Sequence, residues 1–414
     1  MLDLKFVIEN VEEMKKVAKA RGLQVDLVAI ARLGEARAKL LMRAEALRAE
    51  RNRLSKMERT EERLRRAAEI KSELRNLEPQ LKNLEDQLAV LLWQVPNLLH
   101  PDVPIGGGEE ANKVLHEVGK VPDFTFRPLD HEELSRRLDL VDLEAGAKVA
   151  GSKFYYLKNE AVLLEFALIK YAYDILLKEG FIPFISPDLA REGMLDGVGF
   201  NPRGPQSDIY RLEGEDLGLI GTAEVTLGAY HAGEVLKGEG LPLKYAGFSH
   251  CFRREAGSYG KYSKGLYRVH QFSKVEMFVF CEPEKSERMH DYLLKLEEKI
   301  FRGLKIPYRV VDTCSGELGA PAYRKFDLEA WLPGRGDWGE VTSASNCTDY
   351  QARRLNIKYR DRDGRLRFVH TLNGTAVATS RAIVAILENY QQKDRSVKIP
   401  TVLQSYAGKR LIKA

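Results

Sequence analysis

The chain has 414 residues, 30% of them charged, and a formal net charge of +5. A chain of this length exceeds one compact core, so we expect at least two domains. The mild positive charge permits a nucleic-acid partner without requiring one. No stretch approaches the ~18 consecutive apolar residues of a membrane span, and the first residues lack a basic segment followed by an apolar run. These features predict a cytoplasmic protein that does not associate with membranes.

The four cysteines are widely spaced and include no Cys-x-x-Cys pair. This pattern argues against an evident zinc site and against a disulfide-stapled scaffold, and it indicates reduced thiols. The four are Cys251, Cys281, Cys314 and Cys347.

The first predicted elements are two long helices with a seven-residue repeat. In the first, leucine recurs at every seventh position, as Leu33, Leu40, Leu47 and Leu54. In the second, apolar residues alternate at spacings of four and three, as Ile70, Leu74, Leu77, Leu81, Leu84, Leu88, Leu91 and Val95. The polar residues 56–62 would reverse the chain between them. The pattern predicts an antiparallel helical hairpin, an arm of roughly 45 Å at ~1.5 Å per residue. Pro79 is expected to kink or weaken the second helix.

Periodicity alone is compatible with a dimerisation or protein-interaction coiled coil. The basic residues of the hairpin are interspersed with acids, which is more typical of a solvated helix face than of a nucleic-acid patch. These basic residues include Arg37, Arg51, Arg53, Arg59, Arg65 and Arg66. The pattern therefore leaves the partner of the arm open.

The second helix ends at Val95-Pro96-Asn97, because proline and asparagine interrupt helices. A turn-rich segment with three consecutive glycines, Gly106 to Gly108, follows it. We therefore predict an N-terminal domain over residues 1–100, a linker over 101–125 and a second domain over 126–414.

The second domain mixes helical and strand-like patterns. Helices are predicted at Ala161–Lys178 and Ser286–Leu304. Strands are predicted at Leu243–Phe248, Val275–Cys281, Tyr308–Val311, Lys325–Trp331 and Leu366–His370. Several of these strands follow one another across hairpin-sized gaps, which favours an antiparallel sheet in an α+β domain.

Two segments far apart in the chain each present an arginine. The first is Arg253-Arg254-Glu255, and the second is Thr375 to Arg381, which leads into an apolar helix. A turn is predicted at Asn373-Gly374-Thr375, before that helix. The planar fork of arginine matches phosphate, and nucleotidyl transfer depends chiefly on positioning and on charge neutralisation. Two arginines on one nucleotide are therefore the strongest functional signal in the sequence.

A loop is predicted over Ala256–Gly265, after the first arginine segment, and a strand over Tyr267–Phe272. An aromatic residue on such a strand can stack on a base, a contact worth roughly 1–3 kcal/mol. We interpret His270 on this strand as a core histidine in preference to a catalytic one.

Three further segments are weak signals when each is taken singly. Gly180 to Pro187 is typical of a helix stop followed by a strand. Thr222-Ala223-Glu224 follows a glycine, which indicates either backbone close to a ligand or a helix capped by Thr222. Glu340 to Ser343 follows a predicted strand end at Gly339. It offers a carboxylate for a divalent cation, with an ordinary edge-strand glutamate as the alternative.

Taken in this order, the segments resemble the three signature motifs of class II aminoacyl-tRNA synthetases. The whole chain resembles the seryl-tRNA synthetases of the common bacterial and eukaryotic type. Single class II motifs are loose, but this ordered set is specific and runs nearly from end to end. Besides the helical arm, the set comprises Gly107–Asn112, Leu129–His131, Gly221–Glu224, Arg268–Phe272, Ser345–Arg354 and Leu387–Gln391.

The resemblance implies a class II catalytic core and a role for each motif residue. The implied ATP site comprises Arg253, Arg254, Glu255, Phe272, Glu340, Val341, Thr342, Ser343 and Arg381. Arg253 would hold the α-phosphate and Arg381 the γ-phosphate, while Glu255 would meet the adenine and Phe272 would stack on it. The implied catalytic residues are Arg253, Glu340 and Arg381, with Mg²⁺ on Glu340 and Ser343. The residues implied around serine are Thr222, Ala223, Glu224, Glu276 and Thr375.

The resemblance also implies an activity and partners. The activity is ATP-dependent attachment of L-serine to tRNA(Ser) through a seryl-adenylate, and to tRNA(Sec) in selenocysteine biosynthesis where that tRNA exists. Gly180 to Pro187 would be motif 1, the interface of a homodimer. The arm would grip the extended variable arm of the tRNA, in place of the dimerisation role considered above.

The chain departs from the family pattern at a few small residues. Ala344 stands where many members have cysteine, and Thr342 replaces a frequent serine. Both are small, so we expect little effect, and Thr375 keeps the hydroxyl of the commoner serine. Two other interpretations are an inactive paralogue, which the intact arginines disfavour, and an amino acid:carrier-protein ligase, which would lack the arm.

Overall fold

The computed structural model describes residues 2–58, 60–199, 208–255 and 262–414. The chain divides into two compact units, Met1–Leu98 and Leu99–Ala414, and each is described by itself. Among the described helices, none combines the length and the apolar composition needed to cross a membrane.

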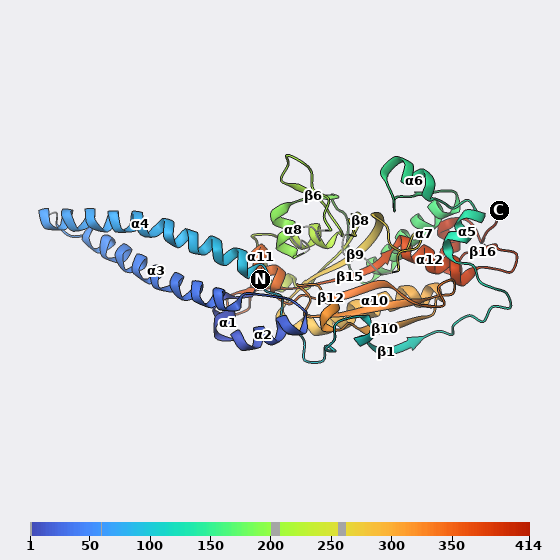
Figure 1. Ribbon diagram of the computed structural model, residues 1–414, viewed down its shortest axis with the longest axis horizontal. Coiled ribbons are helices and arrows are strands. Elements are labelled where there is room, and N and C mark those ends of the chain that lie inside the picture. The colour runs from blue at the N-terminus through green and yellow to red at the C-terminus, as the bar shows by residue number, and fades with distance from the viewer. Residues whose placement is uncertain (1, 59, 200–207, 256–261) are drawn as a thin grey trace. The chain divides into compact units, whose positions relative to one another are not determined.

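The first unit is entirely helical and contains the predicted hairpin (Figure 1). Its helices are α1 (Leu4–Glu9), α2 (Val11–Ala20), α3 (Leu27–Leu54) and α4 (Glu61–Leu92). The side chain of Asp26 caps α3 by accepting from the Ala29 amide at 2.8 Å. The two long helices have 28 and 32 residues, or about 42 and 48 Å at 1.5 Å per residue, which confirms the expected length.

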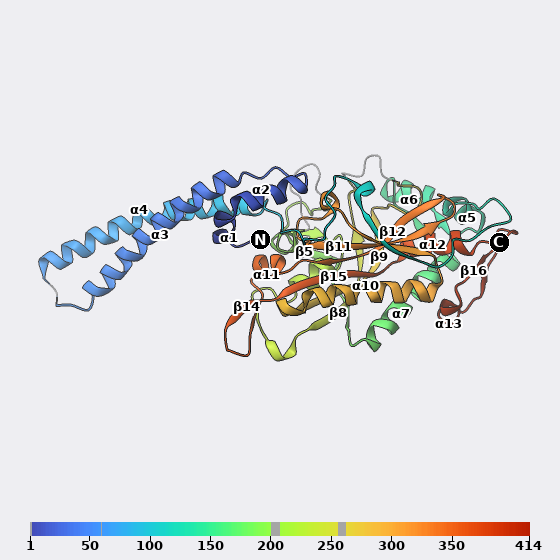
Figure 2. The same ribbon diagram turned by 90° about the horizontal axis from the view of Figure 1, so that it is seen from below.

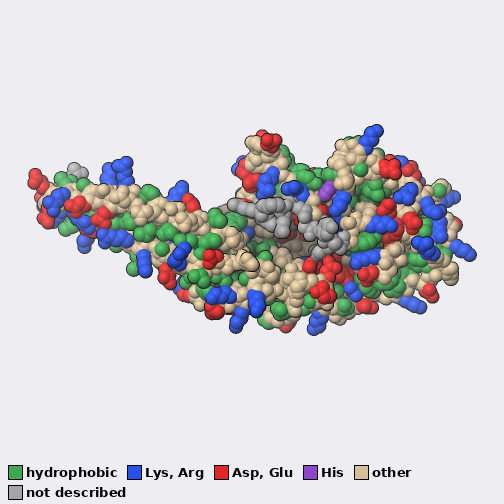
Figure 3. All heavy atoms as spheres, viewed as in Figure 1, with side chains coloured by type: hydrophobic (Ala, Val, Ile, Leu, Met, Phe, Trp, Pro, Cys, Tyr) green, Lys and Arg blue, Asp and Glu red, His purple; other side chains and the backbone are tan. Residues whose placement is uncertain are grey.

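The seam between α3 and α4 follows the predicted heptads. Ala44, Leu47, Ile70 and Leu74 form its buried cluster. The assigned helix α4 continues through Pro79. Four arginine–glutamate pairs cross from one helix to the other, and the first and last of them along α3, Arg37–Glu85 and Arg66–Glu50, confirm the antiparallel arrangement. They are Arg37–Glu85 (2.8 Å), Arg43–Glu73 (2.7 Å), Arg48–Glu78 (3.0 Å) and Arg66–Glu50 (2.8 Å). Figure 3 shows the two signs of charge interspersed along this unit.

The second unit is built on an eight-stranded sheet of order β1-β10-β11-β12-β15-β9-β8-β4. All neighbours are antiparallel except β4 and β8, which are parallel, so the predicted α+β class with an antiparallel sheet is confirmed. The strands are β1 (Lys113–Val118), β4 (Ile182–Ile185), β8 (Leu243–Phe252), β9 (Gln271–Cys281), β10 (Tyr308–Asp312), β11 (Arg324–Leu332), β12 (Asp337–Asn346) and β15 (His370–Ala378). Residues 101–125, predicted as a linker, thus include the edge strand β1.

Three long helices pack on this sheet and bury its main core (Figure 2). They are α7 (Glu160–Lys178), α10 (Ser286–Leu304) and α12 (Thr379–Tyr390). The first two confirm the predicted helices to within one residue. The α10 stripe of Leu293, Ile300 and Leu304 is fully buried, as expected for an amphipathic helix that covers a sheet.

Shorter elements complete the unit. The remaining α-helices are α5 (His131–Arg137), α6 (Leu143–Ala150), α8 (Glu192–Val198), α9 (Glu224–Ala229), α11 (Tyr350–Leu355) and α13 (Gln404–Ala407). The minor strands are β2 (Val141–Asp142), β3 (Tyr156–Leu157), β5 (Leu189–Arg191), β6 (Leu217–Leu219), β7 (Val235–Lys237), β13 (Lys358–Arg360), β14 (Leu366–Phe368), β16 (Val397–Lys398) and β17 (Leu411–Ile412).

Several local predictions were wrong. The strand expected over Tyr267–Phe272 begins only at Gln271, because the preceding residues turn to bring Arg268 onto Glu255. The turn expected at Asn373 to Thr375 lies inside β15. There, Gly374 has no side chain because Glu297 Oε1 lies 3.1 Å from the place a Cβ would take. Of the expected loop Ala256–Gly265, residues 256–261 lie outside the described part of the chain.

Candidate active site

The candidate site lies on the face of the sheet opposite α10, across β9, β15, β12 and β11. Glu276 on β9 is the cross-strand partner of Thr375 on β15, and Ser343 on β12 is that of Asp327 on β11. Cross-strand partners share a face, so these side chains form one row. The cavity beside them is lined by Arg253, Glu255, Tyr267, Arg268, Val269, Phe272, Lys274, Glu340, Val341, Thr342, Ser343, Thr375, Ala378, Ser380 and Arg381.

Arg253 enters this cavity directly after β8. Its guanidinium carbon lies 5.4 Å from the centre of the Phe272 ring, and its Nε donates to the Gly221 carbonyl at 3.2 Å. His270 Nδ1 lies 2.9 Å from the Arg253 carbonyl oxygen, and the His270 ring packs on Phe154. His270 is half-buried, and it holds the backbone of the arginine.

The other two charged residues of the first arginine segment, Arg254 and Glu255, differ in where their side chains lie. Glu255 has a positive φ of 53° and pairs with Arg268 at 2.5 Å, so its carboxylate is fixed beside the cavity. Arg254 is exposed and is absent from the cavity lining. A positive φ at a non-glycine residue is uncommon and persists only where the surroundings enforce it. Here the ion pair with Arg268 supplies that restraint.

Arg381 and Glu340 form the second charged centre of the cavity. Arg381 Nη1 lies 3.1 Å from Glu340 Oε1 and donates to the Glu340 carbonyl at 3.1 Å. The same carbonyl accepts from the Tyr267 hydroxyl at 3.0 Å, and the Tyr267 ring lies 4.9 Å from the guanidinium. Burial raises the pKa of Glu340, but the positive charges of Arg381, Lys325 and Arg253 outweigh it and lower the pKa to about 2. The carboxylate is therefore ionised at neutral pH.

Glu340 lies within β12, which pairs with β11 at this residue and with β15 only at Ala344–Asn346. Thr342 lines the cavity, but its hydroxyl donates to Glu297 Oε2 of α10 at 2.9 Å. Val341 is buried and Ser343 is half-buried.

The strand β11 contributes a buried pair that the sequence did not single out. Lys325 Nζ lies 3.0 Å from Asp327 Oδ2, which also accepts from the Thr313 hydroxyl at 3.1 Å. Burial raises the pKa of Asp327 to about 6, against the positive charge of Lys325. Because Asp327 faces Ser343 across the strands, this pair borders the row of polar residues.

A cluster of polar side chains adjoins the cavity and contains the residues predicted around serine, of which Thr375 also lines the cavity. The Thr222 hydroxyl donates to Glu276 Oε2 at 3.1 Å and accepts from the Glu224 amide at 3.2 Å. The N-cap of α9 is nevertheless Ala223, not Thr222 as one interpretation of the sequence held. Ala223 itself is fully buried, so Thr222, Glu224 and Glu276 supply the polar groups.

Glu224 is held by two amides. Its Oε1 accepts from Gln351 Nε2 and from Asn373 Nδ2, each at 2.8 Å. Burial and the nearby Glu276 raise the pKa of Glu224 to about 7. Burial also raises the pKa of Glu276, against the positive charge of Lys274. Two neighbouring carboxylates in such a cluster suit a ligand that brings its own positive charge and hydrogen-bond donors.

Sequence reasoning missed Lys274, Gln351 and Asn373. Lys274 and Glu276 lie two residues apart on a buried strand, so their side chains are on the same face. The two-residue period of the strand could have predicted that Lys274 lies beside Glu276. Gln351 and Asn373 are far apart in the sequence, and only the packing of α11 on β15 brings both onto Glu224.

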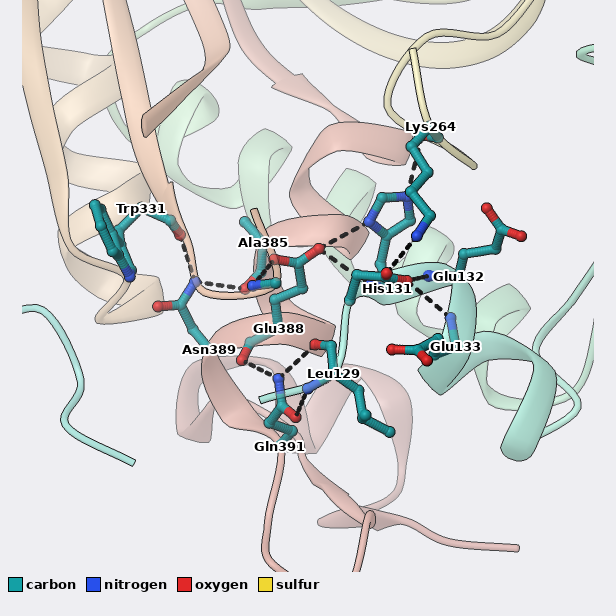
Figure 4. A network of polar contacts seen from close by, with 12 residues as sticks. Leu129, His131, Glu132, Glu133, Lys264, Trp331, Ala385, Glu388, Asn389 and Gln391 are labelled. Carbon is teal, nitrogen blue, oxygen red and sulfur yellow. Dashed lines mark hydrogen bonds and ion pairs between the residues drawn. The ribbon is translucent and has the colours of Figure 1, made fainter. Parts of the chain in front are cut away.

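Two motifs without an assigned role in the sequence meet at the far end of α12, the helix that carries Arg381 (Figure 4). Glu388, which is fully buried, accepts from the His131 amide at 3.1 Å and lies 2.8 Å from His131 Nδ1. Gln391 exchanges two hydrogen bonds with the backbone of Leu129, at 2.8 and 2.9 Å. The segments Leu129–His131 and Leu387–Gln391 thus anchor α12 and, through it, the position of Arg381.

Comparison with known proteins agrees with this geometry. Residues 1–99 match the family described as seryl-tRNA synthetase N-terminal domain. Residues 209–390 match the tRNA synthetase class II core domain of the G, H, P, S and T enzymes. The serine–tRNA ligase of Dictyoglomus thermophilum is 56% identical over 99% of this chain and 98% of its own, and that of Rubrobacter xylanophilus is 50% identical over 100% and 99%. This chain belongs to the seryl-tRNA synthetase family.

Solved structures place the fold in the same family. The seryl-tRNA synthetase of Pyrococcus horikoshii, solved with ATP, superposes with a TM-score of 0.91 at 43% identity and covers 100% of this chain and 99% of its own. A prolyl-tRNA synthetase from Giardia lamblia shares the fold alone, with a TM-score of 0.58 at 15% identity over 66% of this chain and 54% of its own. The class II synthetase core with a long helical hairpin is therefore established for this chain.

Proposed function

We propose that this member of the family attaches L-serine to tRNA(Ser) in two steps through a seryl-adenylate, and acts likewise on tRNA(Sec) where that tRNA exists. One observation carries the proposal. Arg253 and Arg381, 128 positions apart in the sequence, line one cavity, and the carboxylates of Glu224 and Glu276 lie beside it. Phosphate clamps beside a site for a small ammonium compound are what amino-acid activation requires.

ATP would lie in the cavity with its phosphates between the two arginines. Arg253 would hold the α-phosphate and Arg381 the γ-phosphate, while the adenine stacks on Phe272 and meets Glu255. Arg381 pairs with Glu340. When ATP binds, the γ-phosphate would replace part of the contact between the guanidinium of Arg381 and the Glu340 carboxylate. Arg254, Val341 and Thr342 would complete the ATP site, Thr342 through its backbone because its hydroxyl bonds Glu297.

The donors at this site fit a magnesium ion. Among the described residues there is no cluster of three or more His, Cys, Asp or Glu that could hold a metal by itself. Glu340 supplies one ionised carboxylate and Ser343 one hydroxyl, and Mg²⁺ commonly takes few protein oxygens together with water and substrate phosphate. Glu340 and Ser343 would hold the ion, which when bound neutralises phosphate charge and orients the phosphates.

Serine would occupy the adjoining pocket. Thr222, Ala223, Glu224, Glu276 and Thr375 would surround it, with the carboxylates available to its ammonium group and its hydroxyl. A site built to hydrogen-bond a hydroxyl rejects an analogue that lacks it by roughly 10⁴–10⁵, so alanine would be excluded. Threonine, which is larger by one methyl group, would be excluded by the tight packing around Ala223.

The chemistry would need no general base for activation. The serine carboxylate attacks the α-phosphorus in line, pyrophosphate leaves, and Arg253 and Arg381 offset the charge on the phosphoryl oxygens. In the second step, a terminal ribose hydroxyl of the tRNA attacks the carbonyl carbon of the adenylate and AMP leaves. Glu340 would hold Arg381 in position through their ion pair and, with Ser343, would hold the ion.

The remaining parts of the chain support the rest of the assignment. Residues 1–100 would form the tRNA-binding domain, whose arm grips the variable arm of the tRNA. Residues 101–125 would connect it to the catalytic domain, 126–414. The segment Gly180–Pro187 contains β4, an edge strand whose Ile182 and Ile185 are 51% and 84% exposed. An open apolar edge strand suits pairing with a second copy, so we place the homodimer interface there. We also place the protein in the cytoplasm.

Acylation of unfractionated tRNA tests this proposal. The protein would be incubated with ATP, magnesium, total tRNA and each labelled amino acid in turn. We expect stable label on tRNA with serine only, at the 3′ end of serine-accepting species. Label with a different amino acid, or none at all from a folded protein, would overturn the proposal.

A further inference from the structure

Lys274 is a buried cation at the serine pocket to which the proposed function gives no role. It lies on β9, two residues before Glu276, and is 6% exposed. Its ammonium group is ion-paired with Glu276 Oε2 and lies 3.4 Å from Thr375 Oγ1, to which it donates. One lysine thus contacts both of the residues that meet across β9 and β15.

The two carboxylate oxygens of Glu276 differ in their hydrogen bonds. Oε2 accepts from Lys274 and from the Thr222 hydroxyl, so it is fully engaged. Within the described residues, Oε1 accepts no hydrogen bond. A carboxylate held firmly by one oxygen presents the other as an acceptor of fixed direction.

The bond from Lys274 also sets the orientation of the Thr375 hydroxyl. An ammonium group can only donate, so Thr375 Oγ1 is the acceptor in this contact and its own hydrogen must point elsewhere. Thr375 and Glu276 are cross-strand partners on the face of the pocket. Glu276 Oε1 is thus a fixed acceptor and the Thr375 hydroxyl a fixed donor beside it. Together they match an alcohol group, which can donate one hydrogen bond and accept another.

The charge balance of the pocket gives Lys274 a second effect. Glu224 and Glu276 share the pocket, and the fully buried Glu297 lies beneath them on α10. Burial alone would favour protonated carboxyl groups here. The ammonium group of Lys274 lowers the pKa of Glu276 against this effect of burial, and so favours the carboxylate form, whose Oε1 is an acceptor.

We propose that Lys274 is a positioning residue for specificity, which orients Glu276 and Thr375 to recognise the hydroxyl of the amino-acid substrate. The inference rests on the proposed function, because it assigns serine to this pocket. Lys274 acts through its two neighbours and does not need to touch the substrate. A lysine that were only a structural counter-ion would support the binding of any small amino acid equally.

The experiment compares Lys274→Met and Lys274→Arg with a matched control, Lys244→Met. Lys244 is a half-buried lysine on the neighbouring strand β8, where it packs over the rings of Phe181 and Tyr292, outside the cavity. Serine-dependent ATP–pyrophosphate exchange gives KM and kcat for each full-length variant. Competition by L-alanine in the same assay gives the inhibition constant of an amino acid that lacks the hydroxyl.

We expect Lys274→Met to raise the KM for serine by about 100-fold and to change the inhibition constant of alanine by less than about threefold. Lys274→Arg should restore part of the serine affinity, and Lys244→Met should leave both constants unchanged. A serine KM within about threefold of wild type in Lys274→Met would overturn the inference. A parallel weakening of serine and alanine would also overturn it, because the role would then be general.

The pH profile supplies a further readout. The polar and titratable groups that face Glu276 are Lys274 on its own strand, Thr222 and Glu224 at α9, Cys251 and Arg253 at the end of β8, Thr375 on β15 and Glu297 on α10. Removing Lys274 takes away a charge that lowers the pKa of Glu276, so the acid limb of kcat/KM should move to higher pH. An unmoved limb would contradict the inference. If wild type shows no serine-dependent exchange, the proposed function fails and this inference fails with it.

Discussion

The helical hairpin and the catalytic sheet use the same kinds of charged side chain in opposite ways. On the hairpin, Arg43 and Glu73 pair at 2.7 Å with side chains that are 58% and 36% exposed. On the sheet, Lys274 and Glu276 pair with side chains that are 7% and 2% exposed. Exposed pairs are screened by water and contribute about 0–1 kcal/mol, whereas a buried charge that loses its partner costs about 3–5 kcal/mol.

The difference shows what each region is built for. The hairpin derives its stability from a leucine seam, so its surface charges can change with little effect on folding and remain available to a partner. On the sheet, burial raises the pKa of Glu224, whereas the positive charges of Arg381, Lys325 and Arg253 lower that of Glu340. Perturbed groups gathered in one cavity are typical of a site that does chemistry.

The largest expected effect comes from the catalytic face. Arg381→Ala should lower amino-acid-dependent ATP–pyrophosphate exchange by about 10³-fold or more, because it removes a charge clamp on the triphosphate. The anchoring of α12 by Glu388 and Gln391 should keep the variant folded, which circular dichroism would check. Arg367→Ala, which breaks an exposed pair with Glu284, is the control. Near-normal exchange by Arg381→Ala would refute the assignment of this residue.

A truncation of the hairpin separates the two regions directly. Removing residues 43–77 and closing the helices with a short glycine–serine turn keeps the Arg37–Glu85 pair and removes the outer seam. Acylation of tRNA should be lost, while serine-dependent exchange without tRNA should stay within about threefold of wild type, because no residue of the site lies in the hairpin. Equal loss of both activities would mean that the hairpin is structural.

Removing one paired cation from each region compares what a buried and an exposed ion pair contribute to the free energy of unfolding. Lys325→Met leaves Asp327 buried without its partner and should lower the free energy of unfolding by about 3 kcal/mol. Arg43→Met removes an exposed partner of Glu73 and should lower it by less than about 1 kcal/mol. Denaturant unfolding measures both variants. Equal costs would show that burial does not distinguish the two kinds of pair.

Glu224→Gln should change the free energy of unfolding in a way that depends on pH. The pKa of Glu224 is about 7 in the folded chain, against an ordinary value of 4.5 for a glutamate in water, so folding favours its protonated form. Wild type therefore loses stability relative to the variant as pH rises from about 4.5 to about 7. We expect the variant to be more stable by about 3 kcal/mol above pH 7 and equal below pH 4.5. Unfolding curves across this range with a constant difference would contradict the pKa.

The sequence predicted the elements whose pattern is local. The heptads from Leu33 to Val95 specified the hairpin, because each leucine needs only the facing helix to be buried. The helices Ala161–Lys178 and Ser286–Leu304 were likewise specified by their own apolar stripes. The cavity residues Arg253, Glu340 and Arg381 were found because their motifs occur in a characteristic order.

The sequence failed where a distant residue decides the local structure. Asn373-Gly374 is typical of a turn, yet the segment continues as β15 because it pairs with β12 on one side and with β9 on the other. Glu297 of α10 fills the space that a side chain at Gly374 would take. Tyr267 to His270 alternates like a strand, but the pairing of Arg268 with Glu255 bends it. Lys274 was missed because a lysine on a strand suggests an exposed face, and only the sheet shows that it is buried with Glu276.

The most direct measurement is ATP–pyrophosphate exchange with magnesium and without tRNA, for each of the twenty amino acids. It tests the central claim that the cavity and the adjoining pocket together activate one small hydroxylated amino acid. The account predicts exchange with serine alone. Absence of exchange with every amino acid from a folded protein, or exchange with alanine as fast as with serine, would contradict it.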